Sequence, residues 1–335
     1  MKIYIDAMGG DNAPGEIVKG AVEAAREYKV PIVLVGQEKA VRDALDRYDT
    51  ANLQIEILNA DTVIGFNEEP VRAIRHKKDS SIVVGLRAVK ENPEDVFISA
   101  GSTGALLAGA QLILGRIRGI KRPALGVSIP QGGRSMFTLD VGASADTKPE
   151  FLLQYAELGT VYCEAVMGIA NPSVGLLNIG TEEEKGSIVV KEAHQLLKDS
   201  SLNFYGNVES KDLLTAQADV LVTDGFTGNI VLKLTEGLMS FIMHELKSRM
   251  MGSFKGKIGG LMIKDDLKAF KNQFDSEEYG GSPFLGVKGG VIKTHGSSKA
   301  KSVKNAVRQA IRFSENDVVA KITQQLENSR GSIEA

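Results

Sequence analysis

The sequence predicts an α/β fold in which helices cover both faces of a largely parallel sheet. Short apolar runs rich in β-branched residues alternate with helical patterns over most of the 335 residues. Several runs are almost entirely apolar, which is typical of strands that are buried on both faces. Such alternation builds βαβ units with right-handed crossovers, so we expect a three-layer α/β/α arrangement.

Each element follows from this pattern in chain order. The runs predicted as strands are 3–5, 32–35, 53–58, 96–99, 124–129, 136–141, 174–179, 220–223 and 291–294. Apolar residues at helical spacing predict helices between them, including 15–28, 40–48, 103–117, 150–167 and 187–198. Ligands of such sheets bind beyond the carboxyl ends of the strands. We therefore look for the functional site in the turns that follow the strands.

No linker, internal repeat or low-complexity tract divides the chain, so we expect a single domain over 1–335. The exception is 230–274, which we expect to form a protruding helical hairpin. Its first half carries one narrow polar stripe and is otherwise apolar, so this helix needs cover on more than one side. A central core helix and a subunit interface both satisfy that need. The stripe consists of Lys233, Glu236, Ser240, His244 and Lys247.

The second half of this segment mixes apolar and lysine side chains. Gly256, Gly259 and Gly260 make it a poor autonomous helix, so its order should come from a partner. An anionic membrane surface or an acidic protein would suit this mixture. A packed hairpin with solvated lysines is the alternative. The candidate contact residues are Phe254, Lys255, Lys257, Ile258, Leu261, Met262 and Lys264.

Composition restricts the class of protein. The chain is 43% hydrophobic and 24% charged, which is globular, and its net charge of −2 does not favour nucleic acid. A single cysteine, Cys163, excludes an internal disulfide and a thiolate zinc site, which fits a reducing cytoplasm. The N-terminus enters a strand directly, without the pattern of a signal peptide. We expect a cytoplasmic protein with no metal.

Seven stretches rich in Gly, Ser, Thr and Asn lie where strands end: 6–11, 99–104, 140–143, 178–182, 223–229, 279–282 and 295–298. Such junctions leave backbone N–H groups unpaired at the positive end of a helix, and these groups suit phosphate. Several together predict one shared pocket. The residues expected to line it are Asp6, Gly9, Gly10, Asp11, Asn178 and Thr181.

Two of these turns precede helices and predict phosphate binding. Ser102 is placed to cap the helix 103–117, while its hydroxyl and the nearby amides face an anion. Capping alone is the alternative. The turn 223–229 has the same order of strand, turn and helix. The candidate phosphate ligands are Ser102, Thr103, Gly104, Asp224, Thr227, Gly228, Asn229, Ser297 and Ser298.

Two ionisable residues are candidate catalytic groups. Lys185 lies just past the turn 178–182 among three glutamates, where it is either a solvated surface residue or a flexible cation that reaches the ligand. His295 follows the strand 291–294 and precedes Gly296. Histidine titrates near neutrality, so it can hydrogen-bond phosphate or hand a proton to a leaving group.

Several common motifs are absent. Gly9 and Gly10 do not form the G-x-G-x-x-G spacing of dinucleotide folds, and no P-loop motif occurs, so NAD and ATP lose support and we expect no cofactor. The G-x-S-x-G motif is also absent, and Cys163 has an apolar helical setting with no basic neighbour. If group transfer occurs, the bound anion itself is the expected nucleophile.

Together the motifs resemble those of the bacterial phosphate acyltransferase family, which makes acyl-phosphate from acyl carrier protein at the start of phospholipid synthesis. The resemblance covers essentially the whole chain. It rests on Ile5-Asp-Ala-Met-Gly-Gly-Asp11, Ile98-Ser-Ala-Gly101, Leu139-Asp-Val-Gly-Ala143, Asn178-Ile-Gly-Thr-Glu182, Lys185-Gly186, Asp224-Gly-Phe-Thr-Gly-Asn229 and Lys293-Thr-His-Gly-Ser-Ser298. It implies a fold similar to isocitrate and isopropylmalate dehydrogenases and phosphotransacetylases. It also implies a homodimer, transient contact with the membrane surface and handover to a membrane glycerol-phosphate acyltransferase.

Two positions depart from the commonest family pattern. Ser102 stands where the family usually has Asn, and it can still donate to phosphate. Asn12 stands where His is frequent, and it cannot shuttle a proton. The resulting hypothesis is that bound phosphate attacks the thioester of an acyl carrier protein. A nicotinamide-dependent dehydrogenase of the related fold and a non-catalytic adaptor that docks the carrier protein at the membrane are the competing interpretations.

Overall fold

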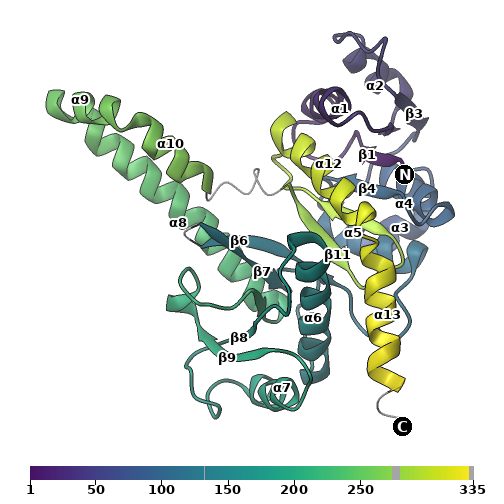
Figure 1. Cartoon of the computed structure of the whole chain (residues 1–335). Coiled ribbons are helices and arrows are strands. Elements are labelled where there is room, and N and C mark those ends of the chain that lie inside the picture. Colours follow the sequence, from purple (N-terminus) through teal and green to yellow (C-terminus); the bar gives the residue numbers. More distant parts are fainter. Residues whose placement is uncertain (132, 274–279, 332–335) are drawn as a thin grey trace.

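The computed structural model describes residues 1–131, 133–273 and 280–331. It contains two sheets with helices around them, and a long helical arm projects from one side (Figure 1). The strands of the first sheet are β1 (Ile3–Asp6), β2 (Ile32–Gly36), β3 (Ile55–Asn59), β4 (Val96–Ser99), β5 (Ala124–Leu125), β11 (Ser282–Leu285) and β12 (Gly290–Lys293). Their order is β3-β2-β1-β4-β12-β11-β5, and the first five of these are parallel.

The second sheet has the order β6-β7-β10-β8-β9 and is parallel except for the pair β6 and β7. Its strands are β6 (Val127–Gln131), β7 (Arg134–Leu139), β8 (Val174–Asn178), β9 (Phe204–Glu209) and β10 (Val220–Val222). The α/β class expected from the sequence is therefore confirmed, although its strands are divided between two sheets.

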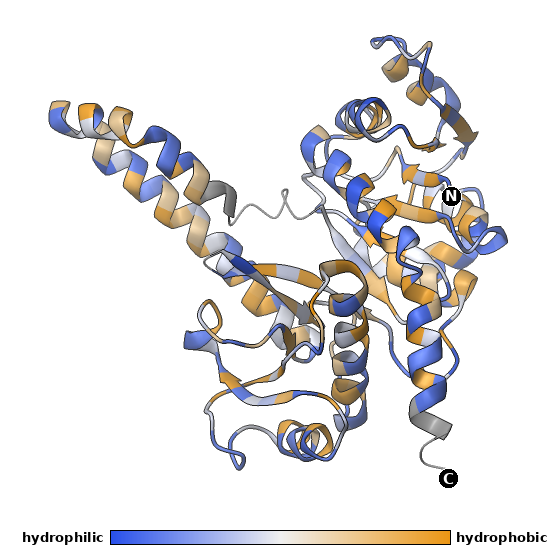
Figure 2. Ribbon diagram, viewed as in Figure 1, coloured by the Kyte–Doolittle hydropathy of each residue, from blue (hydrophilic) through white to orange (hydrophobic). Residues whose placement is uncertain are grey.

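Helices cover both faces of the first sheet. These are α1 (Gly15–Tyr28), α2 (Glu38–Leu45), α3 (Pro70–His76), α4 (Ser81–Glu91), α5 (Thr103–Gly109) and α12 (Ala300–Glu315). Alternating residues of β1 explain the layers: Ile3 and Ile5 share one core with Val18 of α1, while Tyr4 shares the other with Leu86 of α4. The strands β1, β2, β4 and β12 are buried along their whole length because both of their faces are covered, whereas the edge strand β3 is partly exposed. The hydrophobic residues of both sheets stand out in Figure 2.

The second sheet is accompanied by α6 (Pro149–Tyr162), α7 (Ile188–Lys198) and α13 (Val318–Gly331). Its other helices form the arm: α8 (Gly225–Met251), α9 (Phe254–Met262) and α10 (Lys264–Gln273). The chain passes between the two sheets at Gly126, which separates β5 from β6. A Cβ there would lie 2.3 Å from Cζ of Phe137. The expected single strand 124–129 is therefore two strands in two sheets.

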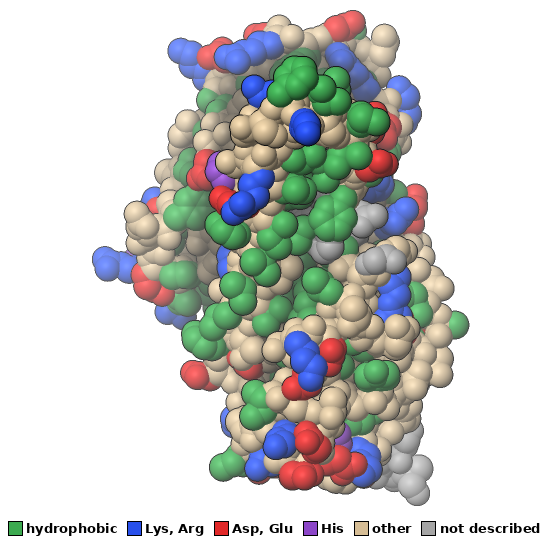
Figure 3. Space-filling model, turned by 90° about the vertical axis from the view of Figure 1, so that its left-hand side faces the viewer, with side chains coloured by type: hydrophobic (Ala, Val, Ile, Leu, Met, Phe, Trp, Pro, Cys, Tyr) green, Lys and Arg blue, Asp and Glu red, His purple; other side chains and the backbone are tan. Residues whose placement is uncertain are grey.

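The arm settles one alternative left by the sequence. In α8 only Gly225 and Gly228 are buried, whereas Leu234 and Phe241 are 66% and 61% exposed. The interpretation of this segment as a central core helix is therefore wrong. Hydrophobic side chains gather on the face of the molecule that carries the arm (Figure 3). Phe274, the last residue of the expected hairpin, lies outside the described residues.

Candidate functional site

A cleft of about 450 Å³ lies where the carboxyl ends of strands from both sheets face the start of α8. The residues that line it come from turns far apart in the sequence. Its polar residues include Thr103, Ser144, Asn229, Lys233, Lys293, Thr294, His295, Ser298 and Ser302. Phe66 and Phe226 are among its apolar residues. The turns at 99–104, 140–143, 223–229 and 295–298 therefore converge as predicted, whereas no residue of the predicted turns 6–11 and 178–182 lines the cleft.

The first turn is tied to the last one. The backbone N–H of Asp11 donates to the carbonyl of Gly296 at 2.8 Å. The side-chain amide of Asn12 donates to the carbonyls of Ser297 and Ser298, at 3.0 and 3.2 Å. Asn12 thus has a positioning role that the sequence did not indicate. Gly10 has a φ of +97° and no room for a side chain, because a Cβ would lie 2.9 Å from the Gly296 carbonyl.

Asp6 holds the end of β1 against the turn that follows β4. Its carboxylate accepts a hydrogen bond from the Ser99 hydroxyl at 2.7 Å, and that hydroxyl accepts one from the N–H of Gly101 at 3.0 Å. Burial raises the pKa of Asp6, and the hydrogen bonds from Ser99 oppose that rise. Gly9 packs directly on it, since a Cβ there would lie 2.5 Å from Oδ2 of Asp6. Asp6 and Gly9 are part of the scaffold rather than residues that line the cleft.

The two helix-start turns use their polar residues mainly as caps. The Ser102 hydroxyl accepts from the N–H of Ala105 at 3.4 Å, and the Asp224 carboxylate accepts from the N–H of Thr227 at 2.8 Å. Thr103 and Asn229 face the cleft instead. Each turn therefore holds its helix with one side chain and presents the next polar residues to a ligand.

Asp140 organises the side of the cleft that belongs to the second sheet. Its carboxylate accepts from the backbone N–H groups of Leu125 at 2.9 Å, Ala143 at 3.0 Å and Ser144 at 2.8 Å. Burial raises the pKa of this carboxyl, and the backbone donors oppose the rise. The start of α8 packs against the same loop, because a Cβ on Gly228 would lie 1.9 Å from the Asp140 carbonyl oxygen.

Positive charge gathers at the end of β12. The Lys293 ammonium is buried and donates to the Thr294 carbonyl. Burial, and then the neighbouring Lys233, lower the pKa of Lys293 to about 8. His295 Nε2 lies 3.1 Å from the ammonium of Lys233, and its Nδ1 lies 2.8 Å from the Ser297 hydroxyl. Partial burial and Lys233 also lower the pKa of His295, so its neutral form is favoured at neutral pH.

Three hydroxyls beside these cations have no hydrogen-bond partner among the described residues. They belong to Thr294, Ser298 and Ser302, and all three side chains are buried and line the cleft. Buried hydroxyls are rarely left unpaired, so such a set indicates a place for a ligand with several acceptor oxygens. Together with Lys293, they fit an anion such as phosphate.

The structure does not bring Lys185 to this cleft. Its side chain is exposed on a separate turn after β8, and its carbonyl accepts from the Asn178 amide at 3.1 Å. Asn178 also accepts from the N–H of Ile179 at 2.8 Å, and Thr181 is exposed nearby. Lys185, Asn178 and Thr181 do not line the cleft. Of the turn 279–282, Gly281 and Ser282 line it, while Tyr279 lies outside the described residues.

Sequence reasoning missed Lys293, Lys233, Ser144 and Phe226. Lys293 was detectable, because it is a lysine that ends an apolar strand directly before a candidate histidine. Lys233 belonged to the polar stripe of α8, but only the packing of α8 beside β12 brings it to His295. Within the described residues no group of three or more His, Cys, Asp or Glu side chains is placed to hold a metal.

Comparisons with known proteins agree with this geometry. A model of the fatty acid synthesis protein family matches residues 1–321. The chain is 50% identical over 328 residues to a phosphate acyltransferase of Clostridium novyi (strain NT), covering 98% of this chain and 99% of that protein. It is also 50% identical to a phosphate acyltransferase of Alkaliphilus oremlandii (strain OhILAs), covering 97% of each.

Solved structures share the fold at low identity. A branched-chain phosphotransacylase from Enterococcus faecalis V583 superposes with a TM-score of 0.57 at 15% identity, over 94% of this chain and 99% of that chain. A 4-hydroxythreonine-4-phosphate dehydrogenase from Klebsiella pneumoniae gives a TM-score of 0.55 at 12% identity, over 93% and 99%. The sequence relatives define this α/β chain as an enzyme of the acyltransferase class. Within that class, the chain belongs to the phosphate acyltransferase family.

Proposed function

We propose that the protein transfers a fatty acyl group from an acyl carrier protein thioester to inorganic phosphate, giving acyl-phosphate for phospholipid synthesis. The observation that carries this proposal is the set of unpartnered hydroxyls of Thr294, Ser298 and Ser302 beside the buried Lys293. A phosphate dianion brings acceptor oxygens for these donors and negative charge for the ammonium. Thr103 and Asn229 line the same cleft and would be available to the remaining oxygens.

In the proposed reaction, a phosphate oxygen attacks the thioester carbonyl carbon. A C–O bond forms, the C–S bond breaks, and the thiol of the carrier's pantetheine leaves. That thiol should have a pKa of about 8.5, as free cysteine does, so its departure needs little acid assistance. Placement should matter more than proton transfer, since orientation can recover about 7 to 11 kcal/mol of barrier against about 2.7 to 4 from one oxyanion donor.

The proposed roles divide by position. His295 lies at the rim, where its Nε2 accepts a hydrogen bond from the Lys233 ammonium. For His295 to donate to phosphate or to the carbonyl oxygen of the thioester, Lys233 must pair with the bound anion instead and Nε2 must carry the proton. Ser297 holds the Nδ1 side of His295. Ser102, Gly104, Asp224, Thr227 and Gly228 form the turns that aim Thr103 and Asn229. Lys185 is proposed as a second cation besides Lys293, and it would have to reach the bound substrate from its own turn.

The decisive assay mixes the protein, acyl carrier protein thioester and phosphate, and traps the product with hydroxylamine. We expect acyl hydroxamate only when phosphate is present. His295→Ala should lower kcat/KM about 100-fold if it is a donor to the developing charge. Lys185→Ala tests the second cation under the same conditions. Turnover that is unaltered in both variants would contradict the proposed catalytic assignment, and hydroxamate formed without phosphate would exclude the reaction.

We further propose that the arm makes transient contact with the cytoplasmic surface of the membrane. Contact with the carrier protein is the alternative role of the same residues. Phe254, Leu261 and Met262 are each at least 75% exposed, and Lys255 and Lys257 lie beside them. Within the described part of the chain, no helix has both the length and the apolar character needed to cross a bilayer. Membrane contact would favour handover of the acyl-phosphate to a membrane acyltransferase. The exposed apolar residues of α8 support the proposed homodimer.

A further inference from the structure

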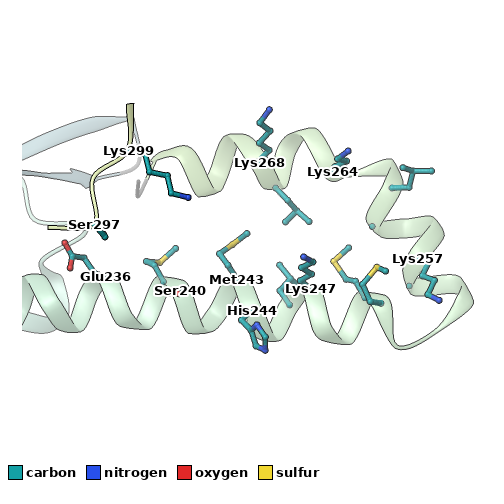
Figure 4. A pocket seen from close by; sticks show the side chains of 18 of the residues that line it. Glu236, Ser240, Met243, His244, Lys247, Lys257, Lys264, Lys268, Ser297 and Lys299 are labelled. Atoms are coloured by element: carbon teal, nitrogen blue, oxygen red, sulfur yellow. The ribbon is translucent and has the colours of Figure 1, made fainter. Parts of the chain in front are cut away.

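A second cavity of about 990 Å³ runs along the arm between α8 and the returning helices α9 and α10 (Figure 4). This volume lies at the upper end of the range of about 300 to 1,000 Å³ that is typical of ligand pockets. Glu236, His295 and Ser298 line both this cavity and the catalytic cleft. The two spaces therefore adjoin at the inner end of the arm, and we call the second one the arm groove.

Seven apolar side chains from both sides line the arm groove, together with two glycines and eleven polar or charged side chains. Figure 4 shows that Met243 and Ser240 point from α8 into the space below α10, and Lys299 reaches in from the inner end. The apolar lining residues are Met239, Met243, Leu246, Met250, Met251, Leu261 and Leu267. Methionine is unbranched and flexible, so a methionine-rich wall adapts to a flexible apolar ligand. The lysines of the groove can line it with their methylene stems while their ammonium groups stay in water.

The groove is long enough to hold one lipid chain. From Glu236 to Met251 α8 advances 15 residues, or about 22 Å at 1.5 Å per residue. An acyl chain of one leaflet fills about half of a hydrocarbon core of about 30 Å, so it is about 15 Å long. The groove is closed at its far end by the contact of α9 with α8. There, a Cβ on Gly256 would lie 2.4 Å from the Met250 carbonyl oxygen, and one on Gly260 would lie 3.1 Å from Met250 Cε.

We propose that the arm groove holds the acyl chain of the substrate, with the thioester at His295 and the methyl end directed toward Met250. This proposal rests on the proposed function. The continuity with the cleft argues for the acyl chain rather than for a partner protein, because a bound chain must leave the reaction centre through an apolar opening. The arm groove opens directly beside His295, and its apolar lining begins at Met239, about one turn of α8 beyond Glu236.

Two pairs of variants test this proposal by chain-length preference. Met243→Trp fills the middle of the groove, and Ser248→Trp places the same side chain on an exposed position of α8 that does not line it. Gly260→Leu adds a side chain against Met250 near the far end, whereas a Cβ on the adjacent Gly259 meets nothing within 4 Å. Gly259→Leu is therefore its matched control. The donors are butyryl, octanoyl and palmitoyl thioesters of the same acyl carrier protein, with hydroxylamine trapping.

We expect kcat/KM to rise about fourfold for each methylene that the groove buries, equivalent to about 0.8 kcal/mol. Met243→Trp should lower the palmitoyl value at least tenfold and leave butyryl within about twofold. Gly260→Leu should lower palmitoyl while sparing octanoyl, and both controls should keep the original profile. Retained butyryl turnover also shows that each variant is folded. An unchanged or uniformly scaled profile would overturn the groove assignment, whereas absence of phosphate-dependent product from every donor would instead contradict the proposed function.

Discussion

At the scale of single residues, Lys293 is a side chain whose charge depends on the fold. Its ammonium is buried beside Lys233, with Asp6 and Asp11 as the carboxylates that partly favour the charged form. His295 also neighbours Lys233, and its lowered pKa favours the neutral imidazole. A cation with a pKa of about 8 is protonated at neutral pH but loses its proton just above it. Phosphate binding should therefore weaken in mildly alkaline solution.

We expect kcat/KM for phosphate to fall as pH rises through about 8, because this parameter reports ionisations of the free enzyme. Lys293→Arg keeps its charge at all such pH values, so the alkaline decline should disappear in that variant. Titration of phosphate itself is common to both proteins and cancels in the comparison. If the decline persists unchanged in Lys293→Arg, another group is responsible.

The lowered pKa of Lys293 should make the folded protein more stable as pH rises, whereas it should make phosphate binding weaker. Below about pH 8 Lys293 is protonated in both the folded and the unfolded chain, so the cost of burying its charge is fully present. Between about 8 and its ordinary value of 10.5, only the unfolded chain keeps the proton. The contribution of Lys293 to the free energy of unfolding therefore rises with pH in that window. Comparison with Lys293→Met isolates this contribution.

At the scale of elements, the start of α8 is fixed by close backbone contact. Gly228 lies against the Asp140 carbonyl, and the loop that Asp140 holds carries Ser144 into the cleft. Gly228→Ala should destabilise the protein by about 1 to 3 kcal/mol, because the added methyl must displace backbone. Gly237 lies on the same helix with open space around it, so Gly237→Ala should stabilise by up to about 1 kcal/mol. Thermal unfolding of both variants checks the contrast, and equal melting temperatures would refute it.

Elements were predictable where local pattern and packing agree. The predicted strand 3–5 appears as β1 over 3–6, because an apolar run predicts a strand that is buried on both faces. The helix over 15–28 appears as expected, because apolar residues at helical spacing determine its buried face. The edge strand β9 was not predicted, because its residues Phe204, Tyr205 and Gly206 are only partly buried or exposed. The sequence placed the start of the arm at residue 230, whereas α8 begins at Gly225. A broadly apolar helix also gives no indication of whether protein, lipid or a bound chain covers it.

At the scale of the whole molecule, the sequence identified the turns but not all of their neighbours. The cleft combines strand ends from two sheets, and only the completed topology places His295 beside Lys233 and separates both from Lys185. A turn rich in glycine predicts that an anion can bind there. It does not specify which other turn faces it, because that depends on the order of strands.

The arm also predicts behaviour of the intact protein at a membrane surface. Flotation with vesicles that contain anionic phospholipid should recover the protein, and added salt or neutral vesicles should reduce recovery, because lysines contribute about 1 kcal/mol each near charged lipid. Phe254→Ser together with Leu261→Ser should lower recovery at least tenfold. Ile188→Ser is the matched control, since Ile188 is 74% exposed on α7. Equal loss in the control, or none in the arm variant, would argue against contact through the arm.

The contact between Gly228 and the Asp140 carbonyl also limits which amino acids position 228 can accept during evolution. Only a hydrogen atom fits between these two backbone segments, so any side chain at position 228 would displace the wall of the cleft. Nine residues further along the same helix, Gly237 has no such neighbour and is free to drift. Natural variation should therefore be sharply unequal between two glycines that look alike in the printed sequence.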